Sequence, residues 1–86
     1  MNKLIIYRKK INKIDKCIVK LLLLRFKLVI KISNYKKINR IKIIDKEREL
    51  QVLNNIKKYS NKKYQKFMIN LFKNIINYSK KIQNIW

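Results

Sequence analysis

The sequence predicts an all-α protein of three helices, in which a long first helix pairs with a second chain as an intertwined antiparallel homodimer. Three observations support this fold class. The chain contains no glycine and no proline, which strands and tight hairpins need at their turns and which helix interiors do not need. Hydrophobic residues make up 48% of the 86 residues, which suits a folded core and not a disordered basic tail. The apolar residues also recur three and four positions apart, which is the period of an α-helix.

The first helix is expected to run to about Lys37, with Asn2 as its N-cap. At 1.5 Å per residue it is roughly 50 Å long, more than the rest of so short a chain can cover. An antiparallel copy of the same helix is therefore the expected partner. The residues of the apolar seam that this partner would cover are spaced as in a coiled coil: Leu4, Tyr7, Ile11, Ile14, Ile18, Leu21, Arg25, Leu28, Ile32 and Tyr35.

The second helix is expected to follow a connecting loop over residues 38–44. Asp45 suits its N-cap, because the carboxylate can accept from the backbone N–H of Glu47 or Arg48 and also faces the positive helix end. The helix is expected to end near Tyr59. Its predicted apolar face consists of Leu50, Leu53 and Ile56.

The third helix is expected from about Lys62 to near Ile85, after a turn at Ser60 and Asn61. No internal repeat or domain boundary is visible, so residues 1–86 are expected to form a single domain. The predicted apolar stripe of this helix consists of Tyr64, Phe67, Met68, Leu71, Phe72, Ile75, Ile76 and Ile82.

The charge of the chain bears on its possible partners. Lysine and arginine number 24 against 4 acidic residues, a formal net charge of +20. Such a charge favours any polyanion, so a basic helical nucleic-acid-binding protein is an alternative function. A cationic membrane-active helix is less favoured, and the longest apolar run, Leu21–Leu24, is far below the ~18 residues that a membrane span needs. Without a cleavage site after an apolar N-terminal segment, a cytoplasmic location is expected.

Cysteine and histidine usage restricts the chemistry. Cys17 is the single cysteine and there is no histidine, so neither an internal disulfide nor a Cys/His metal site can form. We expect no metal and no cofactor. Because Cys17 lies among apolar neighbours on a helix, it is predicted to be a core or interface residue.

Arg25 is the most informative polar residue, because it occupies a position of the apolar seam. An unpaired guanidinium there is costly, so a counter-charge is expected: Asp15 or Glu49 of either chain, or an anionic ligand. Lys36 points the same way roughly 16 Å along the helix and could hold a small molecule with Arg25. Arg8 lies roughly 25 Å before Arg25, too far to share that molecule within one chain. In an antiparallel dimer, Arg8 of the partner subunit can reach it.

Two further polar groups interrupt the later helices. Ser79 and Gln83 share one face of the third helix. The second group, in the first turn of the second helix, consists of Asp45, Arg48 and Glu49. Taken alone, the first pair is typical of a partly exposed helix end, and the second group of a cap with an exposed ion pair.

Taken in order, these residues resemble the all-helical chorismate mutase family over nearly the whole chain. No single motif is specific, but their order and spacing together make a strong signal. Ser33, where the family commonly has glycine, and Lys46, where it frequently has proline, depart from the pattern. The matching motifs are Arg8 followed by Ile11 and Ile14-Asp15, the leucine run ending in Arg25, then Lys36, Asp45-Lys46-Glu47-Arg48-Glu49, and Ile75-Ile76-Asn77-Tyr78-Ser79-Lys80-Lys81-Ile82-Gln83.

The resemblance implies an isomerase that rearranges chorismate to prephenate, on the way to phenylalanine and tyrosine. It implies that Arg25 and Arg8 of the partner subunit bind the substrate carboxylates. Lys36 and Gln83 are then expected to donate to the ether oxygen, and Glu49 to accept from the ring hydroxyl.

The same resemblance gives supporting roles to three more residues. Asp45, Arg48 and Ser79 are expected to line and order the site. Isochorismate pyruvate lyases share this fold and much of the site, so such a lyase is the alternative within the family.

Overall fold

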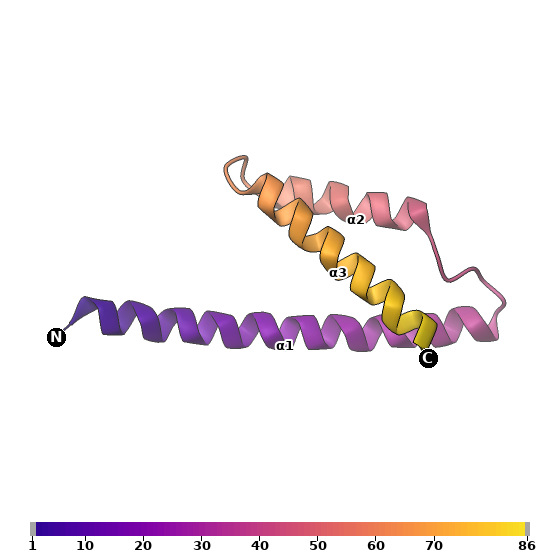
Figure 1. Ribbon diagram of the computed structural model, residues 1–86, viewed down its shortest axis with the longest axis horizontal. Coiled ribbons are helices and arrows are strands. Elements are labelled where there is room, and N and C mark those ends of the chain that lie inside the picture. The colour runs from indigo at the N-terminus through magenta and orange to yellow at the C-terminus, as the bar shows by residue number, and fades with distance from the viewer. Residues whose placement is uncertain (1, 86) are drawn as a thin grey trace.

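The chain is all α-helical in a computed structural model that describes residues 2–85, and the side chains of residues 2–83. Its helices are α1 (Lys3–Ile38), α2 (Lys46–Tyr59) and α3 (Gln65–Ile85). α2 and α3 form a hairpin that diverges from α1: α3 crosses obliquely and meets α1 near the C-terminal ends of both helices, while the N-terminal half of α1 projects away from this contact (Figure 1). The prediction of three helices with a long first one is confirmed. No helix in the described range has a stretch apolar enough to cross a bilayer.

The ends of α1 are set by local hydrogen bonds. At its start the Asn2 side chain accepts from the backbone N–H of Leu4 at 2.9 Å, as predicted for an N-cap. At its end the N–H of Ile41 donates to the carbonyl of Lys36 at 2.8 Å, and the N–H of Arg40 donates to that of Lys37 at 3.4 Å. This pair of bonds is a Schellman motif.

The Schellman motif requires a left-handed residue, and Arg40 supplies it with φ of 54°. Glycine usually takes this position, because a Cβ atom is strained there. The chain has no glycine, so an arginine carries that strain.

The start of α2 agrees with the prediction, and the start of α3 does not. Asp45 Oδ1 accepts from the backbone N–H of Arg48 at 3.0 Å, which confirms the N-cap. The prediction that α3 begins near Lys62 is wrong. Residues 62–64 form a turn that leads into the helix. Asn61, which was predicted to be in the turn, accepts from the N–H of Tyr64 there through both its side-chain and its backbone oxygen, each at 3.2 Å.

The apolar faces are also only partly as predicted. Leu50 is 63% exposed, and Val52 contributes to the inner face of α2 instead, as a half-buried residue. On α3, Phe67 of the predicted apolar stripe is 64% exposed in the single chain.

The contact between α1 and α3 is built around small residues. Ser33, at the position where glycine was expected, is 0% exposed, and its hydroxyl donates to the backbone carbonyl of Gln83 at 3.5 Å, a long and weak hydrogen bond. Ser79, Ile75 and Ile82 on α3 are the other buried side chains of the described residues. A core of this size is small for a chain of 86 residues.

The apolar seam of α1 is largely uncovered within the single chain. Its members from Leu4 to Leu21 are each 50–65% exposed, which is a large apolar surface for a protein in water. Cys17 is exposed as well, so the prediction of a core position is wrong for the single chain. The antiparallel partner helix, and an interface position for Cys17, stay predictions.

Candidate active site

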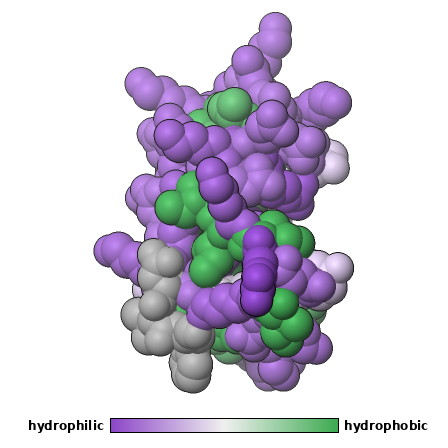
Figure 2. Space-filling model, turned by 90° about the vertical axis from the view of Figure 1, so that its right-hand side faces the viewer, coloured by the Kyte–Doolittle hydropathy of each residue, from purple (hydrophilic) through white to green (hydrophobic). Residues whose placement is uncertain are grey.

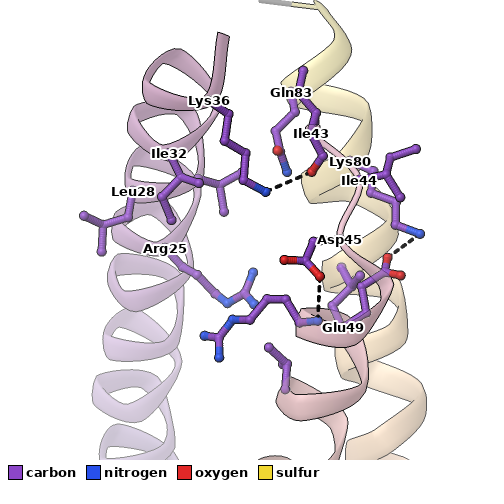
Figure 3. A pocket seen from close by; sticks show the side chains of 14 residues that line it. Arg25, Leu28, Ile32, Lys36, Ile43, Ile44, Asp45, Glu49, Lys80 and Gln83 are labelled. Atoms are coloured by element: carbon purple, nitrogen blue, oxygen red, sulfur yellow. Dashed lines mark hydrogen bonds and ion pairs between the residues drawn. The ribbon is translucent and has the colours of Figure 1, made fainter. Parts of the chain in front are cut away.

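A cavity of about 280 Å³ lies between the C-terminal half of α1, the start of α2 and the end of α3. This volume is near the lower end of the range for small-molecule sites. In Figure 3, Arg25 and Lys36 extend from α1 toward Asp45 and Gln83 across the cavity. The lining residues are Arg25, Leu28, Val29, Ile32, Lys36, Ile43, Ile44, Asp45, Arg48, Glu49, Val52, Ile76, Lys80 and Gln83.

Arg25 is half-buried at the floor of this cavity. Its guanidinium donates to the hydroxyl of Ser79 at 3.2 Å. Burial, and secondarily the nearby charge of Arg48, lower the pKa of Arg25. Among the described residues, neither Asp15 nor Glu49 forms an ion pair with it. A salt bridge of Arg25 with Asp15 or Glu49 of its own chain is therefore absent from the described residues, and one with these residues of the partner subunit stays an open alternative.

Lys36 ties the cavity wall to the α1–α2 connection. Its ammonium donates to the backbone carbonyl of Ile43 at 3.1 Å, while its own carbonyl closes the Schellman turn. An ammonium has three donors, so this bond leaves Lys36 able to donate into the cavity.

The start of α2 supplies three charged side chains to the cavity. Asp45 and Arg48 are exposed at its rim, and Glu49 is half-buried. One Glu49 carboxylate oxygen is fully buried, and it forms an ion pair with the ammonium of Lys80 on α3. This pair links α2 to α3 along one side of the cavity (Figure 3).

Ser79 and Gln83 lie one turn apart on α3. The Ser79 hydroxyl donates to the carbonyl of Ile75 at 2.8 Å while it accepts from Arg25. The Gln83 amide donates to the carbonyl of Ser79 at 3.2 Å, and its second N–H is available for a ligand. Gln83 points toward Lys36 in Figure 3.

The charges around the cavity suit an anion with two negative charges. Four lining side chains are cationic (Arg25, Lys36, Arg48 and Lys80) and two are anionic (Asp45 and Glu49), so two positive charges are uncompensated. The remaining lining is mostly aliphatic. Figure 2 shows apolar side chains at the surface between hydrophilic ones, at the end of the molecule where α1 meets its connection to α2. The site can thus bind a small dianion with an apolar body.

The fold brings together most of the residues singled out from the sequence. Arg25 lines the cavity together with Lys36, Asp45, Arg48, Glu49 and Gln83. Ser79 is connected to the cavity by the hydrogen bond that it accepts from Arg25. Arg8 does not line it; it is exposed on the projecting half of α1.

Lys80 is a cavity residue that the sequence reasoning missed. It shares a helix face with Ile76 and Gln83, at positions four and three residues away, and that spacing could have indicated it. In a chain so rich in lysine, the residue type alone carried no signal.

Comparison with known proteins gives one family. A model of chorismate mutase type II matches residues 7–84, which includes every residue named above for the cavity. No curated protein sequence matches the chain.

Proposed function

The chain belongs to the chorismate mutase type II family, and we propose that the cavity beside Arg25 is its active site for the rearrangement of chorismate to prephenate. We also propose that residues 1–86 form one domain. The observation that supports the site best is Arg25 itself. Two guanidinium groups, of Arg25 and Arg48, lie near each other, and no carboxylate among the described residues neutralises Arg25. A carboxylate of the substrate is the counter-charge that this arrangement lacks.

The chemistry requires positioning and no covalent partner. The rearrangement is a unimolecular pericyclic step in which one C–O bond breaks as a C–C bond forms. An enzyme accelerates it by holding the extended dianion in its compact, reactive conformer. Donors aimed at the ether oxygen stabilise the negative charge that grows there as the C–O bond breaks.

The residues of the cavity offer these functions. Arg25 binds one substrate carboxylate through the planar fork of its guanidinium. Lys36 and Gln83 donate to the ether oxygen, because each keeps a free N–H beside its present bond. Glu49 accepts from the ring hydroxyl.

Three residues support these groups. Ser79 holds the guanidinium of Arg25. Asp45 caps α2 and so orients the first turn. Arg48, at the rim of the cavity, adds positive charge close to the bound dianion.

The proposal includes a second chain at each site. The exposed seam of α1 needs a partner, and an antiparallel α1 would bring Arg8 of the partner subunit to the second substrate carboxylate. The small core of the single chain supports the same assembly. Covering the exposed half of each seam side chain would stabilise the dimer by about 1 kcal/mol.

A paired assay with chorismate and isochorismate tests the reaction. Chorismate consumption with prephenate formation is expected, and release of pyruvate from isochorismate would instead indicate the lyase activity. Lys36→Ala is expected to abolish measurable turnover with an unchanged helical spectrum. Lys31→Ala, an exposed lysine on the same helix, is the matched control. Turnover of neither substrate by the wild-type chain would refute the proposed function.

Mixing two inactive variants tests the shared site. Arg8→Ala and Arg25→Ala chains are each expected to be inactive as homodimers. In a mixed dimer one of the two sites has both arginines, so partial activity is expected to return. Absence of recovery, after subunit exchange has been verified with tagged chains, would contradict a contribution of Arg8 across the interface.

A further inference from the structure

Lys80 stands out because it is a cation of the cavity to which the proposed mechanism assigns no task. It lies on α3 directly after the buried Ser79, and its ammonium forms an ion pair with the Glu49 carboxylate of α2. Its side chain is 36% exposed and that of Glu49 is 23% exposed. The pair is therefore more sheltered than an ordinary surface ion pair, and its strength is less reduced by solvent.

The ion pair decides where the Glu49 carboxylate lies. Figure 3 shows this carboxylate turned toward Lys80 and away from Arg25 and Lys36. One of its oxygens is fully buried and accepts no hydrogen bond from the described residues, so it requires a compensating charge. Lys80 supplies that charge from the α3 side of the cavity.

Without Lys80, the same carboxylate would have other cations within the cavity. Arg25, Lys36 and Arg48 line it together with Glu49. A pair between Glu49 and either guanidinium would neutralise a charge that the substrate needs. Separately, loss of the Lys80 ammonium would lower the uncompensated charge of the cavity from two to one, because Lys80 contributes one of the four cations.

We propose that Lys80 is a positioning residue of this active site, which holds the Glu49 carboxylate against α3 and so keeps Arg25 and Arg48 free for the substrate. The inference rests on the proposed function, since it assigns a role to a residue of the same site. Lys80 acts through Glu49 and does not itself need to touch the substrate. Loss of Lys80 affects substrate binding, because Glu49 released from Lys80 competes with the substrate for the guanidinium groups. It also affects turnover, because the released carboxylate leaves the place from which it accepts from the ring hydroxyl.

Lys80→Met tests the role, because methionine keeps an unbranched apolar side chain and removes only the ammonium. KM for chorismate is expected to rise about tenfold, and kcat is expected to fall as well, because the displaced Glu49 no longer accepts from the ring hydroxyl. Lys80→Arg retains a cation and is expected to recover a KM within about threefold of the wild type. Lys81→Met is the matched control, since Lys81 is the exposed neighbour on the same helix, and its KM is expected to be unchanged.

A double-mutant cycle with Glu49→Gln separates positioning from a merely structural role. If Lys80 acts through Glu49, Lys80→Met changes KM little when Glu49 is already glutamine. Equal losses in both backgrounds would overturn the proposal, as would a Lys80→Met enzyme with wild-type KM. If Lys80→Met fails to fold, Lys80→Arg decides instead, measured with and without Glu49→Gln. A tenfold rise in the KM of Lys80→Arg would overturn the proposal. A wild-type chain without turnover refutes the proposed function instead, so the two failures are distinguishable.

Discussion

Replacing Arg25 by methionine is expected to remove catalysis without weakening the fold. A guanidinium bound to a carboxylate makes two charge-assisted hydrogen bonds, each contributing about 1.5–3 kcal/mol. Their loss costs about 3–6 kcal/mol of transition-state binding, and kcat/KM is expected to fall by roughly two to four orders of magnitude. The hydroxyl of Ser79 keeps its bond to the carbonyl of Ile75 at 2.8 Å, so no buried polar group loses its last partner.

The expected effect of Arg25→Met on stability follows from the sign of the pKa shift. Burial first, and the charge of Arg48 second, lower the pKa of Arg25 in the folded chain. A cation whose folded-state pKa is lowered opposes folding wherever it is protonated in the unfolded chain, which includes the whole neutral range. The thermal unfolding midpoint of Arg25→Met is therefore expected to equal or exceed that of the wild type.

Steady-state kinetics and thermal melts followed by circular dichroism check both halves of this prediction. Lys27→Met, an exposed lysine two residues further along α1, is the control for loss of one positive charge. Near-wild-type kcat/KM in Arg25→Met would refute the assignment of Arg25. A clearly lower unfolding midpoint would show instead that Arg25 is a structural residue.

Four further predictions concern the dimer, the loop and the pH range. Ile18→Lys places a charge in the seam, where the native side chain is 50% exposed in the single chain; it is expected to give monomers by sedimentation and to lose activity, and a stable dimer would contradict the seam. If Arg8 meets Arg25 of the partner subunit, the twofold axis passes near Cys17, so mild oxidation is expected to link two chains through Cys17 and Cys17→Ser chains not at all; no linked product from a verified dimer would contradict this register. Arg40→Gly relieves the left-handed strain and is expected to add about 1 kcal/mol to the free energy of unfolding in urea; no gain would mean that Arg40 has compensating contacts. Turnover is expected to vary little between about pH 6 and 8, because Gln83 donates to the ether oxygen without titrating, unlike a glutamate in its place; a steep loss there would count against the role of Gln83.

The candidate site was predictable to the extent that its residues break a regular pattern. Arg25 interrupts an apolar seam, and Ser79 with Gln83 interrupts an apolar stripe, so each was visible at helical spacing. Asp45 was predictable as a cap for the same local reason, and the structure confirms it. Lys80 was not predictable, because it follows the period of the helix but has the commonest charged side chain of the chain.

The sequence by itself determined that there are three helices, where α1 and α2 lie, and which polar residues are unusual. Helix period, caps and turns depend on interactions between residues a few positions apart, so Asn2, Asp45 and the seam of α1 are readable one segment at a time. The tertiary structure decided which charges meet. The sequence left Arg25 with Glu49 as one possible counter-ion, and the packing of α2 on α3 gives that carboxylate to Lys80 instead. The distance between side chains on different helices depends on how the helices cross, and no local pattern records that crossing.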